Sequence, residues 1–297
     1  MGPLLLPRRQ LTADRIAVFG DLSGHAVPWL RELSKLGVVF DQPQLPRQIV
    51  AWPDDLVTVQ VGDLVHKGSD SDLAVAVVSE LLLPTGRHVQ LAGNHEGQYL
   101  GGATFWDPPV SSRCVQELQQ LWQAGQMVAA AAVVHPDGVQ TLVSHAGAAV
   151  SVHQTLTRRA ARQLDAVTVA GLLADPANDE LVATPGMMRG NDYAVPGVMW
   201  TGAHRELHRP WVDRDAAAGA VPYDQVHGHS APLLYGPRGR MRVPADLAAT
   251  TTHDRKLRHV TTVLPVSGRR IVAIDPGATS RTPTAPRPLL LRGTVHW

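Results

Sequence analysis

The sequence predicts one layered α/β domain over residues 1–297, and three observations support this fold class. Short apolar runs recur along the chain, and each ends in glycine, aspartate, asparagine or histidine. Segments with apolar residues at helical spacing separate the first runs. The chain has 297 residues, of which 44% are hydrophobic, enough to bury one large core. Strands that alternate with helices are typical of parallel sheets covered by helices.

The apolar runs are expected to be buried strands, because they are short and bounded by turn-forming residues. The predicted strands are residues 16–19, 56–61, 88–91, 127–134, 139–143, 224–226, 260–266 and 271–274. The sequence His-Pro-Asp-Gly at 135–138 predicts a hairpin, and residues 267–270 predict a second one. Because hairpins join antiparallel strands, the predicted sheet system is mixed.

Helical spacing of apolar residues predicts helices over 27–36, 72–83 and 115–126. The alanine-rich segment 155–173 is also expected to be helical, and a stretch rich in glycine and proline follows it. We interpret residues 151–222 as a helical lid insertion over the active site, with the core in about 14–150 and 223–277. Residues 278–297 are predicted to be a Pro-rich tail that wraps the surface or is partly mobile.

The composition argues against several classes of partner. The formal net charge is +1, so no broad field attracts nucleic acid or an anionic membrane. No segment approaches the roughly 18 to 20 apolar residues of a membrane span. Pro3 and Pro7 interrupt the first apolar run, so no secretory signal is expected. Cys114 is the only cysteine, which excludes an intramolecular disulfide and favours a cytoplasmic location.

Polar side chains follow five predicted strands, where reactive groups collect in open α/β folds. These residues are Asp21, Asp63, Asn94 with His95, His145, and His229. Each alone has a structural explanation, since an aspartate can cap a helix and a histidine can satisfy a local hydrogen bond. The recurrence of such residues at five strand ends, each with a glycine nearby, favours a shared functional site.

As a set, these motifs resemble the calcineurin-like metallophosphoesterase superfamily, and they are closest to its phosphoprotein-phosphatase branch and related bacterial phosphatases. The motifs are Gly20-Asp21-(x)2-Gly24, Gly62-Asp63-(x)4-Gly68, Gly93-Asn94-His95-Glu96, Ser144-His145-Ala146-Gly147, Gly228-His229-Ser230-x-Pro232 and Ile274-Asp275-Pro276-Gly277. The resemblance implies a calcineurin-like four-layer α/β/β/α sandwich with mixed sheets. It also implies a phosphomonoesterase that acts on a phosphoprotein or a small phosphorylated molecule.

The resemblance further implies a centre of two metal ions. Asp21 would bind the first ion, Asp63 would bridge both, and Asn94, His145 and His229 would bind the second. Two ions about 3.5–4 Å apart neutralise phosphate oxygens and acidify a bridging water. Mixed oxygen and nitrogen ligands suit Mn, Fe or Zn better than Ca, and the sequence does not choose among them. His95 would donate a proton to the leaving group.

The sequence departs from the family pattern in three places. Ser23 stands where the family has a metal-binding histidine, His66-Lys67 replaces an Asp-Arg pair, and Ala92 replaces an arginine. We expect His66 to compensate for Ser23 as a ligand of the first metal, and Lys67 to bring a positive charge to the phosphate. The alternatives are that His25 or water fills the ligand position, and that His66 only hydrogen-bonds His95.

Two other functions remain open at this point. The first is hydrolysis of dinucleoside polyphosphates or nucleotides, for which Arg205, Arg209 and Trp211 are the candidate contacts. The second is a degenerate binding protein without a working centre. His227 is adjacent to the motif of His229, but its side chain is expected to point away from that site if the strand continues.

Overall fold

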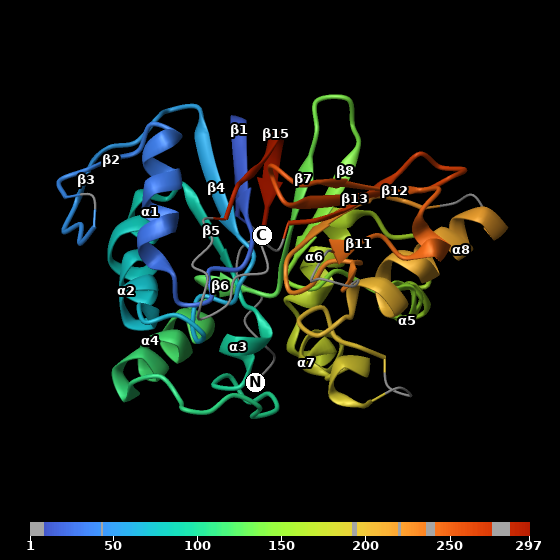
Figure 1. Ribbon diagram of the computed structural model, residues 1–297, viewed down its shortest axis with the longest axis horizontal. Helices are drawn as coiled ribbons and strands as arrows, with labels where there is room; N and C mark the ends of the chain where they lie inside the picture. The colour runs from blue at the N-terminus through green and yellow to red at the C-terminus, as the bar shows by residue number, and fades with distance from the viewer. Residues whose placement is uncertain (1–8, 43, 192–194, 219–220, 236–240, 275–285) are drawn as a thin grey trace.

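An eleven-stranded mixed sheet organises the computed structural model of the chain (Figure 1). The structure describes residues 9–42, 44–191, 195–218, 221–235, 241–274 and 286–297. The strands in order across the sheet are β12 (Thr251–Asp254), β13 (His259–Val263), β14 (Arg270–Ala273), β9 (Asp224–His227), β8 (Gln140–Ser144), β7 (Ala130–Val134), β15 (Leu289–His296), β1 (Gln10–Phe19), β4 (Leu56–Gln60), β5 (His88–Leu91) and β6 (Met127–Val128). Two short ribbons pair β2 (Val39–Phe40) with β3 (Ile49–Ala51) and β10 (Leu234–Tyr235) with β11 (Met241–Arg242).

The sheet is mixed, as predicted. Strands β1, β4, β5 and β6 are parallel neighbours, and so are β8, β9 and β14. The predicted hairpins join β7 to β8 and β13 to β14 in antiparallel pairs. The predicted strand 127–134 is divided at Ala129 into β6 and β7, which pair with different strands. Residues of one apolar run therefore reach two distant parts of the sheet.

The two halves of the sheet pack face to face. Ile16 of β1 and Val59 of β4 share one buried cluster with Val143 of β8 and Val226 of β9. Among the described residues, no helix contributes to this cluster. The strands therefore form two layers with an apolar interior between them. These layers are parts of one continuous sheet, joined where β15 lies between β1 and β7.

Helices cover the outer faces of the two strand layers (Figure 1). One side carries α1 (Ala26–Lys35), α2 (Ser71–Ala76), the π-helical turn Val77–Leu82 and α4 (Ser112–Gln123), and the other carries α5 (Val150–Ala160), α6 (Ala166–Leu173) and α8 (Arg209–Ala218). Strand β1 contributes to the packing against this helical layer through Phe19. The Phe19 ring packs edge to face on Trp29 of α1, with ring centroids 6.2 Å apart. The order α/β/β/α agrees with the predicted four layers. Short helices α3 (Asn94–Gly97) and α7 (Glu180–Ala183) lie near the strand ends.

The C-terminal residues differ from the prediction of a surface tail. Leu289–His296 forms β15, which pairs with β1 on one side and β7 on the other. Val295 is fully buried between the strand layers. The residues before this strand are rich in proline, threonine and arginine, and that composition obscured the alternation of the strand itself. Residues 275–285, including the predicted Asp275-Pro276-Gly277 motif, lie outside the described residues.

The predicted lid insertion has two parts in the structure. Helix α6 packs against β7 and β8, so this part belongs to the outer helical layer. The turn Met187–Arg189 contacts the candidate site instead, through the thioether of Met188. None of the helices in the described part of the chain is long and apolar enough to cross a membrane.

Candidate metal centre

Loops that follow the buried strands bring the predicted ligands together. Asp21, Asp63, Asn94 and His145 are almost completely buried, and His229 is partly buried. The loops are tied to one another directly, because the backbone N–H of His229 donates a 2.9 Å hydrogen bond to Asp21 Oδ1. Residues that are distant in sequence therefore share one small volume.

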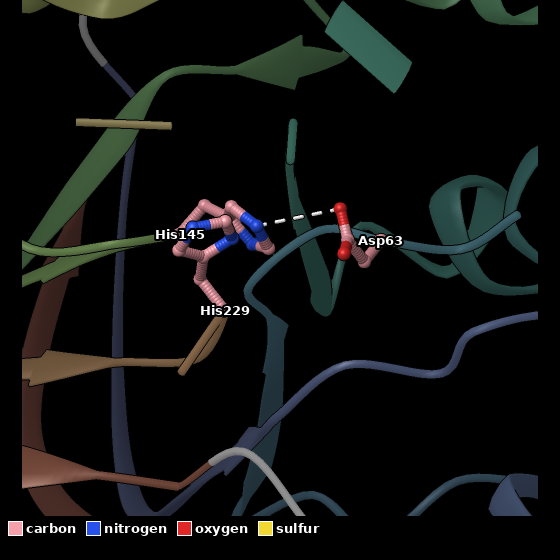
Figure 2. A group of neighbouring side chains, drawn as sticks. All are labelled: Asp63, His145 and His229. Carbon is pink, nitrogen blue, oxygen red and sulfur yellow. Dashed lines mark ion pairs between the residues drawn. The ribbon is translucent and has the colours of Figure 1, made fainter. Parts of the chain in front are cut away.

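Four of these residues direct polar atoms at each other. The ligand atoms of Asp63, His145 and His229 all lie within 4.8 Å of one another (Figure 2). Asn94 Oδ1 lies 3.0 Å from both His145 Nε2 and His229 Nδ1. His145 Nε2 is also 3.3 Å from Asp63 Oδ1. The group combines a carboxylate, an amide carbonyl and two imidazoles, which is a donor set for a transition metal.

The hydrogen bond at the far side of the His145 ring fixes its tautomer. Its Nδ1 lies 3.1 Å from the carbonyl oxygen of Val61, which can only accept, so Nδ1 carries the hydrogen. In this tautomer the lone pair of Nε2 faces the oxygens of Asp63 and Asn94. Lone pairs that converge at this distance repel one another unless a cation lies between them. A backbone carbonyl that orients the ring in this way is typical of metal-binding histidines.

His229 is oriented from the opposite side of its ring. Burial, and then the nearby His145, hold the pKa of His229 well below its usual value, so the ring is neutral. Its Nε2 lies 3.2 Å from Met188 Sδ, a weak acceptor. With the hydrogen on Nε2, the lone pair of Nδ1 faces Asn94 Oδ1. Met188 is thus a contact of the candidate centre that the sequence analysis missed.

The predicted position of the first metal has fewer ligands. Asp21 Oδ1 lies 4.0 Å from His145 Nδ1, beside the group of four. Ser23 is buried, and its hydroxyl makes no hydrogen bond with any described residue. His25 lines a surface hollow together with Lys67 and does not belong to the ligand group found among the described residues. The structure therefore assembles one set of four donors, with Asp21 beside it.

The role of His66 as a metal ligand stays a prediction, and in the structure both of its ring nitrogens face other side chains. Its Nδ1 lies 2.5 Å from His95 Nδ1, and its Nε2 lies 2.7 Å from the hydroxyl of Tyr99. Both ring nitrogens are engaged, as in the alternative in which His66 hydrogen-bonds His95. The backbone at His66 and Lys67 has φ of 72° and 60°, and this left-handed turn redirects the side chain. Spacing along the sequence does not reveal such a turn.

His95 lies between the ligand group and an aromatic wall. Its Nε2 is 3.6 Å from Asp63 Oδ2, and the rings of Phe105 and Trp106 are centred 4.9 and 5.1 Å from its own ring. Burial, followed by the positive charge of Lys67, lowers the pKa of His95. The same two causes lower the pKa of His66 to about 4. Lys67 therefore brings a positive charge close to both imidazoles.

Glu96 organises the loops but was not among the predicted site residues. Its buried carboxylate accepts hydrogen bonds from the backbone N–H groups of Gly93, Asp63, Leu64 and Val65 at 2.8, 2.7, 2.8 and 3.3 Å. It thereby ties the loop of Asp63 to the helix that carries Asn94 and His95. Its place in the Gly-Asn-His-Glu motif was the sequence feature that could have identified it.

Two glycines permit the close approach of these loops. Gly62 has φ of 108°, and a side chain there would overlap the backbone of Gly93. A side chain at Gly93 would in turn overlap the carboxylate of Asp63. Asp63 and His229 themselves have φ of 55° and 60°. Non-glycine residues rarely adopt this conformation, and they concentrate at functional sites.

Two of the three residues considered for nucleotide binding, Trp211 and Arg209, are engaged in other contacts. Trp211 is fully buried and donates to the carbonyl oxygen of Ala148. Arg209 pairs with Asp213 and Asp246. His227 faces His208, with 2.9 Å between their Nε2 atoms, so it points away from the ligand group as expected.

An aromatic group that the sequence analysis did not identify lies nearer to the centre. Phe105 packs edge to face on Trp200, with ring centroids 4.8 Å apart. The guanidinium of Arg189 lies over Phe105, 5.7 Å from the ring centre. Arg189 is exposed and places a second cation, besides the half-buried Lys67, on the side of the turn Met187–Arg189.

Comparison with known proteins gives only distant similarities. No protein-family model and no curated protein matches the sequence. A solved protein serine/threonine phosphatase from Saccharomyces cerevisiae is 16% identical over 87% of this chain and 78% of its own, with a TM-score of 0.43. A cold-active protein-tyrosine phosphatase of a psychrophilic Shewanella species is 16% identical over 88% and 80%, with a TM-score of 0.40. Because these TM-scores are below 0.5, neither similarity assigns an activity to this chain.

Proposed function

We propose that the chain is a metal-dependent phosphoester hydrolase, specifically a phosphomonoesterase. The observation that carries the proposal is the convergence of Asp63, Asn94, His145 and His229, whose acceptor atoms lie 3.0–3.3 Å apart. The same residues carry the sequence motifs that resemble calcineurin-like metallophosphoesterases. Geometry and motif therefore point to one chemistry.

The donor set fits Mn, Fe or Zn. Neutral imidazole nitrogens are poor ligands for Ca and good ligands for these metals. We propose that Asn94, His145 and His229 would hold one ion, that Asp63 would be shared by two ions, and that Asp21 would contribute to the second. When bound, two such ions neutralise phosphoryl oxygens and lower the pKa of a coordinated water.

The remaining chemistry belongs to the residues around the ligands. His95 Nε2 lies 3.6 Å from the bridging carboxylate of Asp63, so a phosphate held at the centre comes within its reach. His95 then protonates the leaving alkoxide, which typically accelerates such reactions by about 10²–10⁴-fold. Lys67 attracts the phosphate as a point charge, without the bidentate contacts of an arginine. The buried loops exclude water from the ligand side.

The same contacts support a proposal for the substrate class. The residues described at the centre, Lys67 and Arg189 among them, suit a single phosphate group on a small molecule or a phosphoprotein. Hydrolysis of dinucleoside polyphosphates becomes a weaker alternative, because Trp211 and Arg209 are committed to other contacts. A cytoplasmic location stays a prediction from the sequence.

The proposal is tested by a substrate panel on protein stripped of metal and reloaded with Mn, Fe or Zn. The panel contains an aryl phosphate, a phosphopeptide, a nucleotide and diadenosine tetraphosphate. We expect metal-dependent release of phosphate from the aryl ester, and slower release from the phosphopeptide. Preferential cleavage of diadenosine tetraphosphate would favour the nucleotide alternative. No turnover with any metal would favour a binding protein.

A further inference from the structure

A chain of hydrogen bonds reaches His95 through its Nδ1. That atom lies 2.5 Å from His66 Nδ1. At the other side of the His66 ring, Nε2 lies 2.7 Å from the Tyr99 hydroxyl and 3.5 Å from Gln98 Nε2. The hydrogens along this chain decide which nitrogen of His95 is protonated. They therefore decide whether His95 can donate a proton toward the centre.

The orientation of the Gln98 amide determines whether His66 Nε2 donates or accepts a hydrogen bond. Its Oε1 accepts hydrogen bonds from the backbone N–H groups of Phe105 and Trp106 at 3.3 and 3.1 Å. The amide nitrogen therefore faces His66, and an amide nitrogen only donates. It follows that His66 Nε2 is an acceptor.

Tyr99 leads to the same assignment by a separate route. Its hydroxyl oxygen accepts a 3.1 Å hydrogen bond from the backbone N–H of Val110. The hydroxyl hydrogen is then available to His66 Nε2. Trp106 stacks on the His66 ring at 5.8 Å with an interplanar angle of 17°, which limits rotation of the ring. Two donors thus face the same nitrogen of a held imidazole.

The positions of the other hydrogens in this chain of hydrogen bonds follow from the assignment of His66 Nε2 as an acceptor. Since Nε2 of His66 accepts, a neutral His66 carries its hydrogen on Nδ1 and donates it to His95 Nδ1. A neutral His95 then carries its own hydrogen on Nε2, the atom that lies 3.6 Å from Asp63 Oδ2. We propose that Gln98 and Tyr99 are positioning residues that act through His66 to hold His95 as the Nε2–H tautomer. The use of that hydrogen for a leaving group rests on the proposed phosphoester hydrolysis.

The tautomer can be read in the metal-free protein without any activity. Long-range ¹H–¹⁵N correlation spectra of protein labelled at histidine distinguish protonated from bare ring nitrogens. We expect Nδ1 of His95 to be bare with Nε2 protonated, and the reverse in His66. A protonated Nδ1 in His95 would overturn the inference, even if the protein hydrolyses phosphoesters. The expected tautomer in a protein without hydrolytic activity would sink the proposed function alone.

Kinetics tests the consequence for the reaction. Tyr99→Phe should lower kcat for an alkyl phosphate by about three- to tenfold, a part of the usual contribution of an acid. KM and turnover of an activated aryl phosphate should change less than about twofold, because that leaving group needs little protonation. Gln98→Glu replaces the donating nitrogen with an accepting oxygen, keeps the oxygen that binds Phe105 and Trp106, and should have the same selective effect.

Tyr223→Phe is the matched control for the loss of a tyrosine hydroxyl. Tyr223 is fully buried, and its hydroxyl contacts Nδ1 of His153 at 3.0 Å, outside the candidate centre. Tyr223→Phe should leave kcat for the alkyl phosphate and kcat for the aryl phosphate unchanged. Equal losses on alkyl and aryl substrates in Tyr99→Phe and Gln98→Glu would show a structural role only, and would overturn the proposed positioning.

Discussion

The carboxylate of Glu96 accepts a 2.7 Å hydrogen bond from the backbone N–H of Asp63. This contact joins the loop after β4 to the helix that begins at Asn94. The backbone of Asp63 has φ of 55°, so the loop adopts a conformation that its own residues do not favour. The buried carboxylate stabilises that conformation and thereby sets the position of the candidate bridging ligand.

Glu96→Gln should reduce the stability of this arrangement. The new amide nitrogen faces a backbone N–H, and loss of a buried hydrogen bond to a charged group costs about 1.5–3 kcal/mol. Urea unfolding measures the difference. Glu80→Gln is the control, because Glu80 is 59% exposed and pairs with the exposed Arg113. An equal loss in both variants would contradict the role assigned to Glu96.

Metal ions should bind in two steps of different affinity. In the proposed centre, Asn94, His145, His229 and Asp63 would hold one ion, whereas Asp21 and Asp63 would hold the other with fewer protein ligands. Isothermal titration calorimetry of the metal-free protein with Mn²⁺ should resolve one tightly bound ion and one weakly bound ion. Asp21→Asn should weaken the second step, and His145→Ala should abolish the first. Equal effects of both changes on the tight step would refute this assignment.

His95→Ala should slow hydrolysis in a way that depends on the leaving group. Loss of a proton donor lowers turnover of an alkyl phosphate by about 10²-fold or more, and turnover of an activated aryl phosphate much less. Bound metal, measured by elemental analysis, should stay the same because His95 is not a proposed ligand. Similar losses on both substrates would indicate a different role for this ring.

His88 should contribute to the pH dependence of stability. It is buried at the start of β5, where it contacts Thr58 and Gln90, and burial lowers its pKa to about 4. Between about pH 4 and 6.5 the unfolded chain therefore binds a proton that the native state does not, so stability falls as the pH falls.

The variant His88→Gln tests this contribution. It should reduce the slope of the unfolding free energy by about 1.4 kcal/mol per pH unit in that window. Unfolding of the metal-free protein in urea at several pH values measures the slope. An unchanged slope would mean that His88 is protonated in the native state.

Much of the fold was predictable because apolar runs and strand ends are local features. The runs before Asp21, Asp63 and Asn94 became β1, β4 and β5, and the structure brings the motif residues together. The contacts of His66 were not predictable, because they depend on a left-handed turn and on Tyr99 and Trp106 from a later loop. Strand β15 was missed because its partner strands are distant in sequence. They are β1, near the other end of the chain, and β7, near its middle.

The bridging role of Asp63 is the most direct test of the account. Asp63→Asn retains the shape of the side chain and removes its charge. Metal content and aryl phosphate turnover should be measured on the same samples, with Asp55→Asn, a surface partner of Arg15, as the control. We predict loss of bound metal and a decrease in turnover of about 100-fold or more, because the bridge loses its charge and a ligand oxygen. Near-normal turnover in Asp63→Asn would contradict a two-metal phosphoester hydrolase.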